Sequence, residues 1–96
     1  MDGGETSAVC VTIHGQVQGV WYRGWTVENA ALRGLSGWVR NRSDGCVEAL
    51  FAGPQDSVED MIALCLDGPP AARVEAIERR PAENPEEAGF QQLPTL

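Results

Sequence analysis

Apolar and polar residues alternate from Ala8 to His14, which is the period of a half-buried strand. A loop with two glycines, Gly15–Val20, interrupts this pattern. A helix is predicted to open at Tyr22 or Arg23 and to run to Arg33. The N-terminal third therefore predicts a strand, a glycine loop and a helix in that order.

Two further strands are predicted over Leu35–Asn41 and Cys46–Ala52, joined by a hairpin turn at Arg42–Gly45 that contains Asp-Gly. A second helix opens at Gly53-Pro54 and ends at Gly68-Pro69-Pro70. Its apolar residues recur at the helical spacing i, i+3, i+4, i+7, i+8 and are Val58, Met61, Ile62, Cys65 and Leu66.

The last predicted strand lies within Arg73–Arg80, and an acidic, proline-containing loop follows over Pro81–Gly89. Phe90–Leu93 could add a short edge strand, although its apolar pattern is poor. The order β-α-β-β-α-β predicts an α+β fold: a ferredoxin-like two-layer sandwich, with two helices on one face of an antiparallel sheet.

The composition fits one globular domain over residues 1–96, because 96 residues with 43% apolar content are too few for two separate cores. Residues 1–7 are acidic and polar, and they are predicted to form a flexible tail. No apolar run approaches the roughly 20 residues of a membrane span, and no secretory signal is visible. We therefore expect a cytoplasmic monomer that does not bind membranes.

The charge is unevenly distributed along the chain. The net charge is −7, which argues against nucleic-acid binding, since that depends on basic side chains. All basic residues are arginines, and four of them fall between His14 and Arg42 beside a single acid, Glu28. A locally basic stretch in an acidic protein favours a small anionic ligand.

The three cysteines, Cys10, Cys46 and Cys65, form no CxxC pair, and His14 is the only histidine. No metal site and no cofactor are predicted from this set. Reduced thiols are expected, with Cys65 as a core residue.

The glycine loop has the features of an anion site. Backbone N–H groups in such a loop can form a concave nest, and the helix N-terminus adds free donors and a positive dipole end. Arg23 at the helix start would add a bidentate cation. The loop lacks the Gly-Lys-[Ser/Thr] of a nucleotide P-loop. The residues alone leave two possibilities open: an anion site, or a tight turn beside a surface arginine.

Two segments of this chain resemble the signatures of the acylphosphatase family. Gly15-Gln16-Val17-Gln18-Gly19-Val20-Trp21-Tyr22-Arg23 is similar to the first signature, a loop of the form G-x-V-Q-G-V-x-aromatic-R. Gly37-Trp38-Val39-Arg40-Asn41-x-x-x-Gly45-x-Val47 is similar to the second. The interval between them also fits, and the resemblance extends from Val9 to Ile77.

The resemblance implies hydrolysis of the carboxyl–phosphate bond of acyl phosphates, without a metal, a cofactor or a covalent intermediate. It assigns phosphoryl binding to Arg23 and positioning of the attacking water to Asn41, the two catalytic residues. The expected substrate-binding residues, mostly through loop amides, are Gln18, Gly19, Val20, Trp21, Tyr22 and Arg23. The expected partner is a small acyl phosphate.

Several alternatives remain at this stage. The chain could be a noncatalytic ferredoxin-like module that binds small anions or RNA, or a carbamoyl-phosphate-handling domain of a hydrogenase-maturation protein. His14 falls on the outward alternation of its strand and is not expected to be a base. Arg40 and Arg42 are predicted to form a solvated rim at the site, and the site is expected to be independent of the last strand. Trp38 is interpreted as a packing residue.

Overall fold

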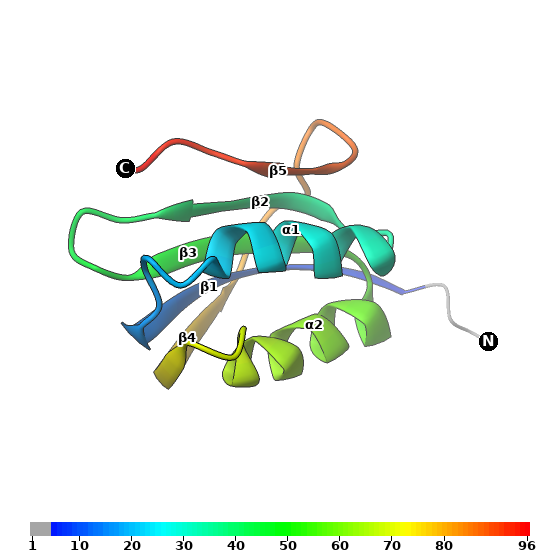
Figure 1. Cartoon of the computed structure of the whole chain (residues 1–96). Coiled ribbons are helices and arrows are strands. Elements are labelled where there is room, and N and C mark those ends of the chain that lie inside the picture. Colours follow the sequence, from blue (N-terminus) through cyan, green and yellow to red (C-terminus); the bar gives the residue numbers. More distant parts are fainter. Residues whose placement is uncertain (1–4) are drawn as a thin grey trace.

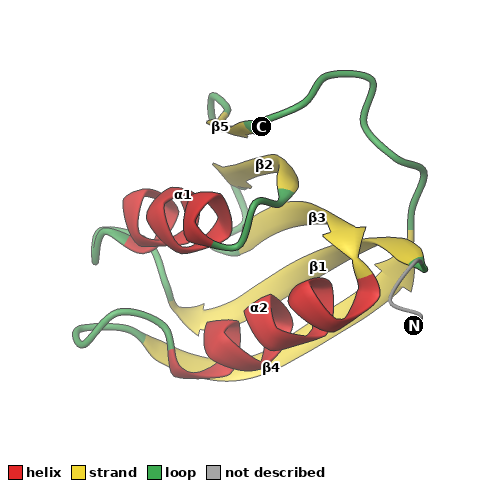
Figure 2. Cartoon of the chain, turned by 90° about the vertical axis from the view of Figure 1, so that its right-hand side faces the viewer, coloured by secondary structure: helices red, strands yellow, loops and turns green. Residues whose placement is uncertain are grey.

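Two helices cover one face of a five-stranded sheet in the computed structural model, which describes residues 5–96 (Figure 1). Figure 2 shows both helices on the same side of the sheet, with no helix on the other side. In chain order the elements are β1 (Thr6–Gln16), α1 (Tyr22–Leu32), β2 (Ser36–Asn41), β3 (Val47–Pro54), α2 (Gln55–Asp67), β4 (Arg73–Pro81) and β5 (Phe90–Gln92). The predicted ferredoxin-like sandwich is confirmed. No helix in this part of the chain is long and apolar enough to span a membrane.

The sheet has the order β4-β1-β3-β2-β5. The pairs β1–β3, β1–β4 and β2–β3 are antiparallel, as predicted, but β5 runs parallel to β2 and makes the sheet mixed. The reason is the path of the chain: β4 and β5 lie at opposite edges, and a parallel pair needs a long crossover connection. Residues 82–89 provide it by crossing the sheet on the side away from the helices (Figure 2).

The first strand is longer than the alternation predicted. It begins at Thr6, which lies opposite Pro54, so residues 6 and 7 belong to the sheet and not to the predicted tail. The first four residues of that tail lie outside the described part. The strand continues past His14 through a register shift at Gly15, where φ is 129°. Any Cβ at Gly15 would overlap the Arg73 carbonyl oxygen, so the bulge requires glycine.

The core lies between the sheet and the helices. The alternating residues Val9, Val11 and Ile13 are buried, as predicted. Within the α2 stripe, Leu66 is 57% exposed while the other four residues are buried. Leu66 is roughly 80° around the helix from Val58, so it falls on the edge of the stripe and not at its centre.

The face of the sheet opposite the helices carries a charge cluster around Glu48, whose side chain is only 5% exposed. Arg40 Nε and Arg80 Nη2 lie 2.9 and 3.0 Å from its carboxylate oxygens, and Arg42 Nη1 lies 3.7 Å away. Burial alone would raise the pKa of Glu48, but hydrogen bonds from Arg40 and Arg80 outweigh it and hold the pKa below its usual value. The prediction of a solvated rim is therefore wrong for Arg40, whose guanidinium is paired with Glu48, whereas Arg42 is 35% exposed and also contacts Asp44.

Candidate active site

A small pocket of about 110 Å³ lies where the glycine loop meets the end of β2. It brings together Arg23, from the start of α1, and Asn41, from the last position of β2. These two side chains, expected to act together, line the same pocket although other elements separate them in sequence. The complete lining is Val17, Gly19, Trp21, Tyr22, Arg23, Gly24, Asn41 and Gln92.

The loop backbone curves so that its amides can face a ligand. Gly19 has φ 76° and Trp21 has φ 67°, both in the left-handed region. Such residues alternate in the concave nests that bind anions. Within residues 5–96, the backbone N–H groups of Gln18, Gly19, Val20 and Trp21 find no hydrogen-bond partner. Amides gathered on the concave side of one loop are available to an external acceptor.

The N-terminus of α1 adds further donors. Trp25 N–H donates the first helical bond to the Trp21 carbonyl at 3.0 Å, and no side chain caps the helix at Trp21. The amides of Tyr22, Arg23 and Gly24 therefore have no intrahelical acceptor. They share the pocket with the loop amides, so the positive end of the helix dipole faces the same space.

Trp21 holds this position at an energetic cost. A left-handed conformation costs an ordinary residue about 1–2 kcal/mol, and Trp21 is the only non-glycine residue of the described chain with positive φ. Strain of this kind is typical of sites where the backbone must aim a functional group.

Gln18 and Val20 do not line the pocket. The Gln18 side chain donates to the carbonyl oxygens of Arg42 and Cys46, both at 2.8 Å. It thereby ties the loop to the β2–β3 hairpin and fixes the distance between the loop and Asn41. Val20 packs against the core, half-buried. Any contribution of these two residues to binding would come from their backbone amides.

Tyr22 lines the pocket, but its ring lies in the core and is 1% exposed. Its hydroxyl donates to the Cys65 carbonyl at 2.5 Å, and burial raises its pKa far above the usual value. The hydroxyl therefore stays protonated and fastens the start of α1 to α2. The aromatic residue before the arginine is thus an anchor for the loop.

Arg23 provides the charge of the pocket. Its side chain is partly exposed, and no carboxylate among residues 5–96 forms an ion pair with it. In the described part of the chain, no other cation and no carboxylate lines the pocket. A guanidinium without an internal partner is available to bind an anion in bidentate geometry.

Asn41 contributes an acceptor. Its side-chain oxygen Oδ1 is buried and has no hydrogen-bond partner in the structure. Its backbone is held on both sides, by pairing with Val47 and by the Leu96 N–H, which donates to the Asn41 carbonyl at 3.0 Å. A buried, free acceptor beside a cation is suited to hold a water molecule.

The C-terminal segment also takes part in the site, although no residue of it was predicted there. Gln92 of β5 lines the pocket, and Leu96 supports the backbone of Asn41. Sequence reasoning missed Gln92 because β5 has little apolar pattern and pairs at a distant edge. It also missed Gly24, where any Cβ would overlap the Trp21 indole nitrogen.

His14 lies outside this pocket, on the open face of the sheet. Its Nε2 is 2.6 Å from Glu78 Oε1, and its Nδ1 is 3.1 Å from Cys46 Sγ. Within residues 5–96, no group of three or more His, Cys, Asp or Glu side chains is placed to hold a metal ion.

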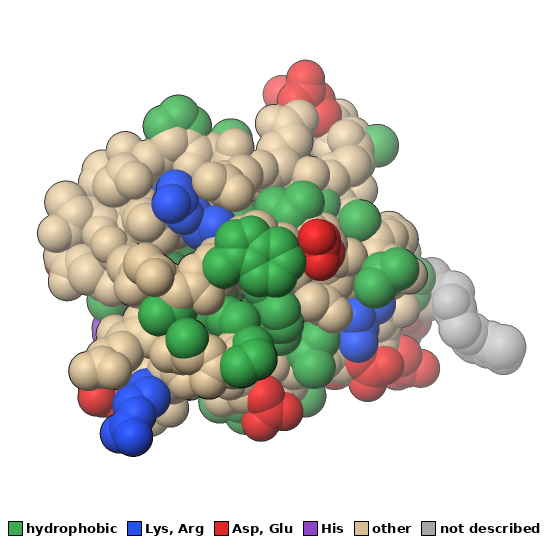
Figure 3. Space-filling view, in the orientation of Figure 1, with side chains coloured by type: hydrophobic (Ala, Val, Ile, Leu, Met, Phe, Trp, Pro, Cys, Tyr) green, Lys and Arg blue, Asp and Glu red, His purple; other side chains and the backbone are tan. Residues whose placement is uncertain are grey.

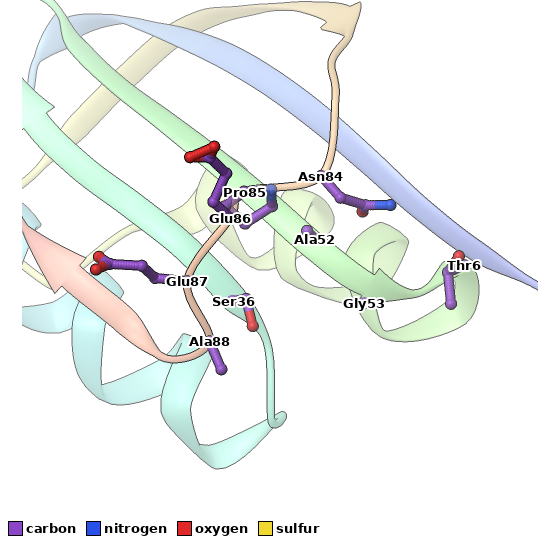
Figure 4. A pocket seen from close by; sticks show the side chains of 9 residues that line it. All are labelled: Thr6, Ser36, Ala52, Gly53, Asn84, Pro85, Glu86, Glu87 and Ala88. Atoms are coloured by element: carbon purple, nitrogen blue, oxygen red, sulfur yellow. The ribbon is translucent and has the colours of Figure 1, made fainter.

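A larger hollow of about 380 Å³ lies between the sheet and residues 84–88. Figure 4 shows Thr6, Ser36, Ala52 and Gly53 on its sheet side, with Glu86 and Glu87 on the crossing loop. It contains two carboxylates and no arginine, so it is unsuited to a phosphate.

Comparison with known proteins places this geometry in a family. The family model described as acylphosphatase matches residues 9–92. An acylphosphatase of Rhodospirillum rubrum is 58% identical over 86 residues, which cover 90% of this chain and 94% of that protein. A solved acylphosphatase from Coxiella burnetii is 31% identical with a TM-score of 0.87, covering 92% of this chain and 93% of that one. A full-length HypF, solved in a phosphate- and nucleotide-bound form, is 27% identical with a TM-score of 0.86; the match covers 95% of this chain but 12% of HypF. The chain therefore belongs to the acylphosphatase family, the enzymes that hydrolyse acyl phosphates.

Proposed function

We propose that hydrolysis takes place in the pocket shared by Arg23 and Asn41, by direct attack of water on phosphorus. The free amides of the loop and of the start of α1 surround the phosphoryl oxygens, and Arg23 binds two of them. This assignment rests on the partnerless Asn41 Oδ1, which places a water acceptor in the same pocket as the cation.

Catalysis in this pocket depends on position and charge. Phosphoryl transfer needs alignment of the nucleophile and stabilisation of charge on the equatorial oxygens. The water oxygen bonds to phosphorus as the bond from phosphorus to the acyl oxygen breaks, and the carboxylate leaves with the electron pair. A carboxylate is a stable leaving group, so no protein acid is needed.

The proton of the attacking water goes to the substrate. No carboxylate or imidazole lines the pocket, and the amide of Asn41 orients water without removing its proton. A phosphoryl oxygen accepts the proton and yields inorganic phosphate. No step uses a metal ion, so activity is expected to survive exhaustive chelation.

The proposal also includes the oligomeric state and the compartment of the protein. We infer a single-domain, cytoplasmic monomer; the pocket of Arg23 and Asn41 is formed within one chain and needs no residue from a second copy. The three cysteines are free and buried, which fits a reducing compartment.

Replacing Asn41 separates water positioning from phosphate binding. Asn41→Ala should lower kcat by about 10²–10³-fold, the effect of losing one preorganised hydrogen-bonding group. Inhibition by inorganic phosphate and the Tm should stay near wild type, because Arg23 and the amides remain. The measurements are kcat with an aryl acyl phosphate in the presence of a chelator, phosphate inhibition, and thermal unfolding.

The matched control is Asn84→Ala, in the exposed crossing loop, which should behave as wild type. An unchanged kcat in Asn41→Ala would exclude a role in catalysis. Parallel losses of kcat and phosphate affinity would instead make Asn41 a phosphate ligand.

A further inference from the structure

Trp21 presents its indole at the mouth of the pocket. The residue is 58% exposed and lines the space shared by Arg23 and Asn41. It is not part of the hydrophobic core or of the residues packed against it. Figure 3 shows the helical face of the molecule, where exposed hydrophobic side chains gather beside an arginine. A large exposed apolar side chain at a pocket favours contact with a ligand.

The backbone conformation at Trp21 gives the fold no reason to prefer tryptophan. With φ at 67°, this position would be occupied most easily by glycine. The indole also caps no helix donor. A tryptophan at this position therefore strains the backbone without capping the helix or filling the core. Backbone strain of this kind is typical of functional sites.

The indole is nevertheless held in place. Its Nε1, Cε2 and Cδ1 atoms lie against Gly24, where a Cβ would meet Cε2 at 2.7 Å and Cδ1 at 2.8 Å. One edge of the ring system thus rests on a backbone that carries no side chain. A rigid aromatic seated in this way binds a ligand with little loss of side-chain entropy.

The size of the pocket determines what the indole can contact. A pocket of about 110 Å³ suits a phosphoryl group with an attacking water and leaves little room for a bulky acyl group. The acyl part of the substrate must project from the mouth, beside Trp21. Flat, conjugated groups gain most from an aromatic surface, because ring stacking adds to simple burial.

We propose that the Trp21 indole is an acyl-binding platform that favours aromatic acyl phosphates over short aliphatic ones. The proposal rests on the function proposed above, because it needs the phosphoryl group to occupy the phosphate cradle, which consists of Arg23 and the free amides of the loop and of the start of α1. A stacked aromatic pair predicts a preference of about 3- to 10-fold in kcat/KM.

The test compares benzoyl phosphate with acetyl phosphate. In Trp21→Gly the ratio of their kcat/KM values should fall by about 3- to 10-fold. The kcat/KM for acetyl phosphate reports any change in phosphoryl binding or hydrolysis. The ratio of the two kcat/KM values therefore isolates the contribution of the acyl group. Trp21→Phe should restore most of the ratio, since it keeps an aromatic ring. Leu32→Ala, an exposed apolar residue at the other end of α1, is the control and should leave the ratio unchanged.

A second variant keeps the indole but removes the backbone surface at Gly24 against which it packs. In Gly24→Ala the new methyl group overlaps the indole edge, so the ratio should fall although Trp21 is present. Ratios that stay within twofold of wild type in both Trp21→Gly and Gly24→Ala would overturn the platform while leaving acyl phosphate hydrolysis in place. A wild-type protein that turns over neither substrate would overturn the proposed function, and the platform with it.

Discussion

Arg23→Lys tests whether the pocket needs a guanidinium or only a positive charge. Arg23 is the one cation that lines the pocket, and no carboxylate among the described residues neutralises it. Lysine keeps the charge but offers a single point of attachment in place of a planar fork. The variant therefore changes geometry while leaving the net charge of the protein at −7.

The size of the effect follows from this environment. Loss of an arginine that stabilises a phosphoryl transition state costs about 10³–10⁵ in rate, or roughly 4–7 kcal/mol at 1.36 kcal/mol for each factor of ten. The loop amides still bind the phosphoryl group, so some activity should remain. We expect Arg23→Ala to lose about 10³–10⁵ in kcat/KM and Arg23→Lys to fall within about tenfold of it.

The assay follows release of phosphate from an aryl acyl phosphate, together with thermal unfolding in phosphate. At 100 times its Kd, phosphate should stabilise the wild type by about 2.7 kcal/mol, a shift of roughly 10–20 °C for a domain of this size. Both variants should lose most of this protection. The matched control is Arg33→Lys at the end of the same helix, where Nη1 donates to the Asn29 carbonyl. Near-normal turnover and phosphate protection in Arg23→Lys would refute bidentate binding by Arg23.

Two predictions concern other parts of the molecule. Glu48→Ala should lower the free energy of unfolding by about 1.5–3 kcal/mol at pH 7 in urea titrations, because it removes the charge-assisted hydrogen bonds that the carboxylate accepts from Arg40 and Arg80. The pKa of Glu48 is lowered by folding, so its contribution is present above the unfolded pKa and is lost as the pH falls through the folded value; a gap between variant and wild type that does not shrink there would contradict the assignment. In thiol alkylation followed by mass spectrometry, Cys46 should react before Cys65. Burial raises the pKa of both thiols, that of Cys65 to about 12, but Cys65 is fully enclosed, whereas Cys46 keeps 9% exposure and has His14 Nδ1 at 3.1 Å as a hydrogen-bond acceptor. His14→Phe should slow only Cys46, and equal labelling of both cysteines in the folded protein would be the contrary result.

The sequence predicted the fold because its periodic signals are local. The alternation around Val11 and the stripe of α2 each identify a buried face without knowledge of the partner. The turn at Asp44-Gly45 then sets the β2–β3 register, which places Asn41 opposite Val47. Arg23 and Asn41 were predictable as a pair from their motifs, and the structure brings both into one pocket.

The remaining features depend on contacts between distant segments. Nothing near Gln92 indicates a site, because β5 reaches the pocket only after crossing the sheet. Gln18 belongs to the loop motif, but its role as an anchor depends on the carbonyls of the hairpin. The sequence does not distinguish a solvated arginine from a paired one. The contacts of Arg40 and Arg42 with Glu48 become visible only when the neighbouring strand is placed beside them.

The pocket concentrates groups that the folded chain leaves unsatisfied. Among residues 5–96 the loop amides have no acceptor, Arg23 has no counter-ion and Asn41 Oδ1 has no donor, while Trp21 holds a strained backbone. The buried Asn41 Oδ1 and the strained Trp21 backbone cost stability, and a phosphoryl group with one water supplies partners for the amides, for Arg23 and for Asn41 Oδ1. The core between the sheet and the helices, which includes Val17 and Tyr22 of the pocket lining, can offset this cost. Groups that lack a partner in the free protein gain one when the substrate reaches the transition state. At that point the phosphoryl oxygens carry the most charge and the attacking water is in line, so the interactions formed there lower the activation barrier.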